Sequence, residues 1–377
     1  MTYLVNKDNY QISSLEMTVT VMSTILGVGI LTLPRSLAKS VGTPDGWISI
    51  LIGLIFNLVL VTLIIKLNQK INGKNIIHYI RETNKASFFI AKLLSMLFIC
   101  YFTFILAFEA RIVTEVIGIY LINQTPSEVA IILMYMATTY AVTKGMQGII
   151  HLKLLLFPIV LFVLLIIIMF NFREFDYKSL LPVGAEGITP IISGTKETIF
   201  SFLGIEILFF FLANANNRKI SPKGINIGLL LLSLLYISST ILAFSILGIE
   251  TTKVITFPFV ELTKEIEIIQ GLIERLEPLI ITVWIMTIFN TMSVFHFIAT
   301  KILKEEFLSK MRGSSIAISV AIISFMITFI PNSIQEAFSF GGFIGYFGLG
   351  LTLFTIVIGF LYVFRSKSRD VKQSEVS

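Results

Sequence analysis

Runs of 18 or more apolar residues recur along the whole of this 377-residue sequence. A helix needs about 20 apolar residues to cross the hydrocarbon layer of a bilayer, so each run is close to the length of one span. Charged residues make up only 14% of the sequence, whereas a soluble protein carries about 25%. The sequence therefore predicts an all-α integral membrane protein that crosses the membrane many times.

The apolar runs divide into ten predicted transmembrane helices. They lie at about 13–34, 46–67, 88–121, 128–143, 154–171, 194–214, 225–249, 277–300, 314–331 and 336–364. We expect a single membrane domain over residues 1–377, with one half at about 13–171 and a second half at about 194–364. A short charged tail at 365–377 follows, and its composition predicts that it is disordered.

The distribution of basic residues orients these spans. If the N-terminus is cytoplasmic, 20 of the 29 Lys and Arg residues, Lys153 among them, fall in inner segments and eight fall in outer segments. Short cytoplasmic loops are enriched in Lys and Arg, so this bias supports an even number of spans with both termini in the cytoplasm. The net charge of +6 is explained in this way and does not indicate nucleic-acid binding.

The first span contains an interruption. It reads Ser23-Thr-Ile-Leu-Gly27-Val-Gly29-Ile-Leu-Thr-Leu-Pro34, with a Gly-x-Gly at mid-depth and a proline that limits how far the helix continues. Glycine weakens a helix by about 1 kcal/mol relative to alanine. Backbone that unwinds within a bilayer must be buried in protein or line a cavity, and secondary transporters build substrate sites from such breaks. Close packing of two helices is the alternative reason for these glycines.

The sixth span repeats this pattern. Its segment Phe202-Leu-Gly204-Ile-Glu206 places a glycine at mid-depth and an acid two residues later. Spans one and six each begin a group of five helices, and because five is odd the second group enters the membrane from the opposite side. The sequence therefore indicates a five-plus-five inverted repeat in which helices 1 and 6 are discontinuous.

Three parts of the sequence resemble the spore-germination permease family, the B subunits of nutrient germinant receptors in endospore-forming bacteria. They are Gly27-Val-Gly29-Ile-Leu-Thr-Leu-Pro34 with the following Thr43-Pro-Asp45-Gly46-Trp47-Ile-Ser, then Leu180-Leu-Pro-Val-Gly184, and Phe202-Leu-Gly204-Ile-Glu206. Many amino acid transporters share the Gly-x-Gly. The Asp45-Gly46-Trp47 segment is what points to the germination branch of the amino acid–polyamine–organocation superfamily.

The resemblance implies a five-plus-five inverted-repeat fold with a small-molecule site between spans one, three, six and eight. It implies a multi-pass protein of the bacterial cell membrane or the spore inner membrane, in complex with a larger membrane A subunit and a lipoprotein C subunit. The implied function is that of a germinant receptor subunit, which binds a small nutrient such as an amino acid and signals to its partners to start germination.

Helix ends supply the chemistry for such a site. Unwinding at Gly27–Gly29 would offer N–H groups and the positive end of a helix dipole to a carboxylate, and unwinding near Gly204 would offer carbonyl oxygens to an ammonium group. For the polar side chains nearby, ordinary interhelical hydrogen bonding is the alternative role. The residues predicted to bind substrate are Ser23, Thr24, Gly27, Val28, Gly29, Tyr101, Ile105, Phe202, Leu203, Gly204, Glu206, Thr287, Asn290 and Thr291.

Two groups of ionisable residues lie within predicted spans. Glu206 is deep in the membrane, where it could bind a substrate amine, take up a proton or hold unwound backbone in place. Glu109, Arg111 and Glu115 lie toward the outer end of span three. Arg111 and Glu115 are four residues apart and can pair on one helix face, so we expect an ion pair near the interface, with a gate as the alternative.

Two further patterns predict packing or partner surfaces. In the outer segment 257–276, Leu262, Ile266, Ile269 and Ile273 recur at helical spacing, which indicates an amphipathic helix that rests on the membrane, acts as a lid or binds a partner. In the last span, small residues predict close helix packing. They are Gly341, Gly342, Gly345, Gly348 and Gly350.

The sequence shows no pattern for catalysis or for a cofactor. Its single cysteine, Cys100, excludes a cysteine cluster, and its three histidines have no partner at metal-ligand spacing. We see no Walker motif or catalytic triad and expect neither an enzyme nor a metal site. The alternative to a receptor is an amino acid transporter coupled to H⁺ or Na⁺, because one scaffold serves both functions. A channel-like subunit is a third class, but no continuous polar stripe supports it.

Overall fold

The computed structural model describes residues 10–83, 85–121, 126–215, 220–264 and 277–374. Within these residues the regular structure is helical, apart from one parallel bridge that joins Ile12 to Ala215. The α-helices are α1 (Ser14–Ile25), α2 (Gly29–Val41), α3 (Gly46–Lys70), α4 (Ile76–Arg81), α5 (Lys85–Tyr120), α6 (Ser127–Thr143), α7 (Gly145–Asn171), α8 (Ile188–Ser201), α9 (Leu208–Phe211), α10 (Pro222–Ile246), α11 (Ile249–Val254), α12 (Pro258–Glu261), α13 (Glu277–Glu306), α14 (Gly313–Thr328) and α15 (Ile334–Ser374).

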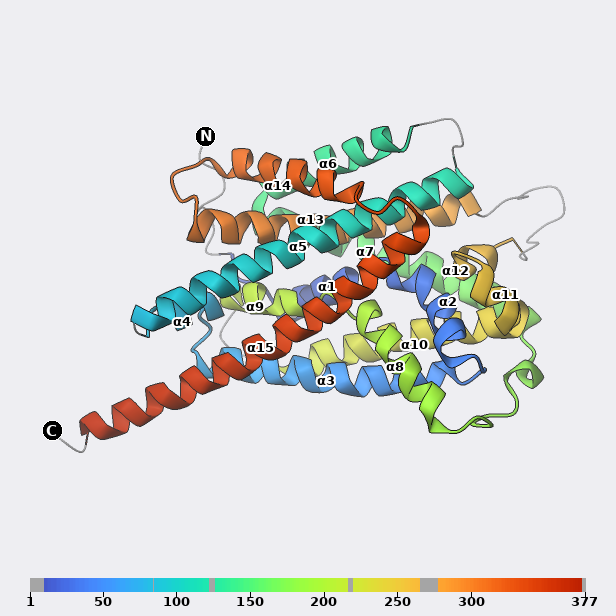
Figure 1. Ribbon diagram of the computed structural model, residues 1–377, viewed down its shortest axis with the longest axis horizontal. Helices are drawn as coiled ribbons and strands as arrows, with labels where there is room; N and C mark the ends of the chain where they lie inside the picture. The colour runs from blue at the N-terminus through green and yellow to red at the C-terminus, as the bar shows by residue number, and fades with distance from the viewer. Residues whose placement is uncertain (1–9, 84, 122–125, 216–219, 265–276, 375–377) are drawn as a thin grey trace.

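The long helices form one elongated bundle (Figure 1). α6, α13 and α14 lie along one side, α3, α8 and α10 lie along the other, and α5 and α15 run obliquely across the bundle. α1 lies between these groups and packs against α7, α10 and α13. α4 and the C-terminal end of α15 lie at one end of the bundle, while α11 and α12 lie at the opposite end.

The prediction of a multi-pass membrane protein is confirmed. Six helices are long and apolar enough to cross a bilayer, and the number rises to eight if each of two bent helix pairs counts as one span. α6 and α14 occupy the predicted fourth and ninth spans but are shorter apolar helices of 17 and 16 residues. All ten predicted positions are therefore helical in the structure.

The start of α1 follows from its local sequence. The Ser13 hydroxyl accepts a hydrogen bond from the Glu16 N–H, and the Glu16 carboxylate accepts one from the Ser13 N–H at 2.8 Å. This reciprocal capping box satisfies two of the donors that a helix start leaves free. The neighbouring Ile12 N–H donates to the Asn214 carbonyl at 2.8 Å, so the start of α1 is fastened to the end of the segment that follows α8.

Several predicted boundaries are wrong. The first span does not end at Pro34, because a proline in the second turn removes only one backbone donor and α2 continues until Gly42, which has a left-handed φ of 74°. α7 begins at Gly145 rather than near 154, so Lys153 lies inside a helix and not in a loop. The tail from Arg365 is helical as far as Ser374, since no glycine or proline interrupts it.

The outer segment 257–276 is only partly described. It starts with the short helix α12, and Leu262 is buried just after it. The remainder of the predicted amphipathic helix, including Ile266, Ile269 and Ile273, lies outside the described residues. The predicted packing role of the last-span glycines is confirmed at two positions, because a Cβ at Gly341 would meet Phe108 at 2.7 Å and one at Gly348 would meet Tyr101 at 2.6 Å.

Candidate functional site between two broken helices

The first break separates α1 from α2. α1 ends at Ile25, where the Leu26 N–H closes the last turn on the Met22 carbonyl at 3.1 Å, and α2 begins at Gly29. The two helices are inclined by 51°. No side chain caps the N-terminus of α2, so its first turn offers N–H donors to another group. The break predicted at Gly27–Gly29 is confirmed.

The second break separates α8 from α9. α8 ends at Ser201, a 3₁₀ turn at Ile205–Ile207 leads into α9, and the two parts are inclined by 47°. Gly204 has a φ of 120°, a conformation that residues with a side chain rarely adopt. The break predicted near this glycine is therefore confirmed, and glycine is required there for a backbone reason.

The two breaks pack directly on each other. A Cβ added to Gly204 would lie 3.0 Å from the Thr24 methyl group and 3.3 Å from the Ile25 backbone nitrogen. A Cβ added to Gly29 would lie 3.1 Å from the Cα of Ser201. Because each glycine lets the other broken segment approach its backbone, neither break can shift far without displacing the other.

Tyr236 joins both breaks from α10. Its hydroxyl lies 2.9 Å from the Ile25 carbonyl and 3.1 Å from the Ser201 carbonyl, which are the last residues of α1 and α8. The side chain is fully buried. Carbonyls at a helix end have no intrahelical partner, so the single proton of one buried hydroxyl is shared between two helix ends.

Glu206 holds the second break from within. Its two carboxylate oxygens each lie 3.0 Å from the Gly204 N–H, and one of them accepts a hydrogen bond from the Tyr101 hydroxyl of α5. Both Glu206 and Tyr101 are buried. These contacts match the third role that the sequence left open for Glu206, which is to stabilise the unwound backbone.

α13 supports the first break. The Trp284 indole donates to the Gly27 carbonyl at 3.3 Å, and the Thr291 hydroxyl lies 3.5 Å from the Ser23 carbonyl. Thr291 and Thr287 also bond to carbonyls one turn earlier in their own helix. Asn290 lies between them, is 1% exposed, and has no partner for either amide atom among the described residues.

Two ionisable side chains that the sequence did not assign to the site lie at the first break. Lys153 of α7 is fully buried and donates to the Thr24 hydroxyl at 3.0 Å. Glu109 of α5 is 4% exposed, and one of its oxygens lies 2.8 Å from the position of a Cβ on Gly27. By contrast, Arg111 pairs with Glu115 at 2.8 Å, as predicted.

One small cavity lies where the breaks meet. Six of the predicted residues line it, together with Glu109 and three phenylalanines. Its volume of about 20 Å³ leaves room for roughly one water molecule, so an amino acid can enter only if the breaks separate. The predicted residues that line this cavity are Thr24, Gly27, Val28, Gly29, Ile105 and Leu203.

The remaining predicted residues are distributed around this cavity. Phe202 and Glu206 line a second cavity between α3 and α15, which Leu203 also reaches, and Thr287 lines a third one beside Trp284. Tyr101 and Gly204 connect to the site through Glu206, whereas Ser23 and Thr291 contact each other. No group of three or more possible metal ligands occurs among the described residues.

Comparison with known proteins assigns the chain to a family. A family model described as "Spore germination protein" matches residues 11–337, which is most of the chain. The chain belongs to the spore germination protein family. One relative is Spore germination protein YndE of Bacillus subtilis (strain 168). It is 28% identical to this chain over 339 residues, which cover 90% of this chain and 92% of that protein. Spore germination protein GerLB of Bacillus cereus is 28% identical over 362 residues, which cover 96% of each chain.

Solved transporter structures share the fold of this germination protein. MhsT in complex with L-phenylalanine has a TM-score of 0.66 and 12% identity, and the match covers 96% of this chain and 100% of MhsT. A Na⁺-coupled sialic acid symporter in an outward-open state has a TM-score of 0.66 and 13% identity. The match covers 94% of this chain and 81% of the symporter chain. At these identities the likeness shows the fold alone.

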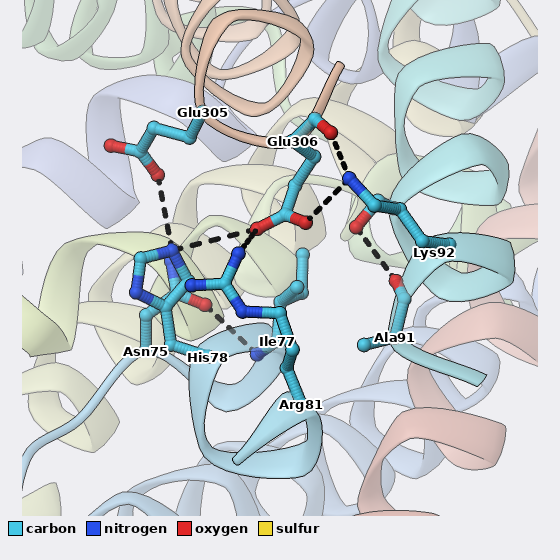
Figure 2. Close-up of polar contacts among 9 residues, drawn as sticks. Asn75, Ile77, His78, Arg81, Ala91, Lys92, Glu305 and Glu306 are labelled. Carbon is cyan, nitrogen blue, oxygen red and sulfur yellow. Dashed lines mark hydrogen bonds and ion pairs between the residues drawn. The ribbon is translucent and has the colours of Figure 1, made fainter. Parts of the chain in front are cut away.

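A second polar cluster lies at the end of the bundle that carries α4 (Figure 2). The Glu306 side chain, at the end of α13, is only 2% exposed and lies 3.1 Å from Arg81 of α4 and 3.2 Å from Lys92 of α5. His78 lies 3.5 Å from the same carboxylate. Close by, a hydrogen bond from Lys74 lowers the pKa of the exposed Glu82 carboxyl. The cluster ties α4 and α5 to α13 and lies apart from the two breaks.

Proposed function

We propose that this chain is a germinant receptor subunit of bacterial spores. In this proposal it binds a small nutrient, an amino acid, at mid-membrane between the broken helices α1–α2 and α8–α9, and it signals to partner subunits to start germination. The chain then has ten spans in a five-plus-five inverted repeat, with halves at about 13–171 and 194–364 and with both termini in the cytoplasm. The proposal contains no catalytic step.

The observation that carries the proposal is the direct contact of the two breaks over one small cavity. An amino acid that enters must move Gly204 away from Thr24 and Ile25, because the cavity of about 20 Å³ is too small to hold it. Since Tyr236 also bonds to the ends of both α1 and α8, this separation would change the positions of two spans together. Binding energy would thereby be converted into a change of shape that a partner subunit can detect.

The proposed partners follow from the family. They are a larger membrane A subunit and a lipoprotein C subunit, assembled with this chain in the spore inner membrane. Its relatives carry the name of spore germination proteins, which supports a receptor over a general nutrient carrier. The ligand class is supported by the walls of the cavity, where Ile105, Leu203 and Phe295 suit an apolar amino acid side chain.

The second candidate is an amino acid transporter coupled to H⁺ or Na⁺. It is favoured by one specific observation, the buried ionisable side chains of Lys153 and Glu109 beside the first break. Ionisable groups at membrane depth are costly and commonly take part in proton or ion pathways. The fold shared with a Na⁺-coupled symporter is compatible with this function but does not demonstrate it.

Proteoliposomes that contain the purified chain separate the two functions. Binding of radiolabelled apolar L-amino acids is measured first, and uptake is then followed under imposed H⁺ and Na⁺ gradients. Saturable binding without accumulation is the result expected for a receptor. Accumulation driven by either gradient would favour the transporter, and absence of binding by the chain alone would contradict the proposal that this subunit contains the complete site.

A further inference from the structure

Two buried acids, Glu206 and Glu109, lie beside the breaks, and they differ in how their carboxylate oxygens are hydrogen-bonded. Both oxygens of Glu206 accept hydrogen bonds, one from Tyr101 and both from the Gly204 N–H. Glu109 is 4% exposed, yet its second oxygen, Oε2, has no hydrogen-bond partner among the described residues. A buried carboxylate oxygen that lacks a partner is costly, so it marks a place where a ligand can bind.

The carbonyl oxygens at the breaks are less available to a cation. Tyr236 serves the carbonyls of Ile25 and Ser201, and the Trp284 indole donates to that of Gly27. Of these three, only the Ser201 carbonyl lies at the break near Gly204, where the sequence offered carbonyl oxygens to the ammonium group of an amino acid. Since all three carbonyls already lie within hydrogen-bond distance of a side-chain donor, the counter-charge for an ammonium group has to come from elsewhere.

Glu109 lies in a suitable position to supply that charge. It lines the same cavity as Gly27, Val28 and Gly29, and one carboxylate oxygen lies 2.8 Å from the Cβ position of Gly27. The uncapped N-terminus of α2, a helix of 13 residues, begins two residues further on. An anionic group and a cationic group of one small molecule could therefore be bound side by side.

We propose that the Glu109 carboxylate binds the ammonium group of the ligand, beside the N-terminus of α2 that the sequence already offered to the ligand carboxylate. This assignment rests on the proposed function and narrows the ligand to molecules that carry an ammonium group and a carboxylate on the same carbon atom.

The test measures the ratio between the affinity for an amino acid and the affinity for the same molecule without its ammonium group. L-Alanine, L-valine, L-leucine and L-phenylalanine are titrated into the full-length chain in lipid nanodiscs, and the best binder is compared with its deaminated carboxylic acid. The wild type is expected to bind the amino acid at least tenfold more tightly. Glu109→Gln should reduce this ratio at least tenfold by weakening the amino acid alone. The control Glu115→Gln changes an acid two turns further along α5, which pairs with Arg111, and it should leave the ratio within twofold.

Gly27→Ala provides a second variant that keeps the carboxylate. Its new methyl group would lie 2.8 Å from the Glu109 oxygen and displace it, so it should also reduce the ratio. If Glu109→Gln does not yield a monodisperse protein, the wild-type ratio and Gly27→Ala still decide the question. Equal weakening of both ligands, or an unchanged ratio, would overturn the role of Glu109 while leaving the proposed function intact. Absence of saturable binding by the wild type would instead overturn the proposed function, and this subsite with it.

Discussion

The ammonium group of Lys153 donates a hydrogen bond of 3.0 Å to the hydroxyl of Thr24, one residue before the end of α1. The Thr24 hydroxyl in turn donates to the Thr20 carbonyl at 2.6 Å, so its lone pairs are free to accept from the lysine. Lys153 is fully buried, and the buried Glu109 of α5 lies against Gly27, three residues further along the chain from Thr24. One lysine of α7 thus fixes the end of a broken helix at the same break that holds a buried acid of α5.

This arrangement predicts strong coupling between Lys153 and Glu109. If Lys153 and Glu109 compensate each other, Lys153→Met and Glu109→Gln each leave one buried ionisable group without its partner, and we expect a loss of about 3–5 kcal/mol in each. The double variant removes both charges and should be more stable than Lys153→Met alone, although it still lacks the bond to Thr24. Unfolding temperatures of the four proteins in nanodiscs give the interaction energy. Losses that simply add would show that the two charges do not interact, and the exposed Lys144→Met is the control for α7.

The sequence predicted both breaks but only part of the site. Glycines in mid-span are a local signal, so Gly27, Gly29 and Gly204 were identified from their position alone. Glu109 was assigned to the interface because Arg111 and Glu115 lie close to it in sequence. Helical spacing could have corrected this, since Tyr101, Ile105 and Glu109 are four residues apart and share one face of α5.

Other site residues left weaker signals or none. Lys153 was counted as a loop residue because it directly precedes a long apolar run, although Ile149 and Ile150 before it already continue the apolar pattern. Tyr236 left no signal, because its role depends on where α10 packs against the ends of α1 and α8. Contacts of this kind are tertiary and cannot be obtained from periodicity or composition.

Gly204 should not tolerate a side chain. At a φ of 120° alanine is strained by about 1–3 kcal/mol, and its methyl group would also meet Thr24 at 3.0 Å. Gly204→Ala should therefore lower the unfolding temperature and weaken amino acid binding more than tenfold. Gly342→Ala is the matched control, since no atom lies within 4 Å of its Cβ position and alanine favours a helix. Equal behaviour of the two variants would contradict the role of Gly204.

Removal of the Tyr236 hydroxyl should loosen both breaks together. Tyr236→Phe leaves the carbonyls of Ile25 and Ser201 without their donor, at a cost of about 1–3 kcal/mol. Hydrogen exchange followed by mass spectrometry should then show faster exchange in peptides that cover the ends of α1 and α8. Tyr346→Phe, which alters an exposed tyrosine of α15, should change neither peptide. Faster exchange at one break only would show that Tyr236 bonds to a single helix end.

The Glu306 cluster predicts that a buried ion pair contributes more to stability than an exposed one at the same end of the bundle (Figure 2). Glu306→Gln removes the charge that Arg81 and Lys92 share, and because the carboxylate is only 2% exposed the loss should be about 1–3 kcal/mol. Glu82→Gln removes the exposed pair with Lys74 and should leave the unfolding temperature nearly unchanged.

Salt provides the second readout for this cluster. Mobile ions screen exposed charges far more than buried ones, so the effect of Glu306→Gln should persist when the ionic strength is raised, whereas any small effect of Glu82→Gln should disappear. Thermal unfolding in nanodiscs at low and high salt measures both variants under identical conditions. If the destabilisation by Glu306→Gln vanished at high salt, the carboxylate would be reached by solvent ions. The cluster could then not be what fastens α4 and α5 to the end of α13.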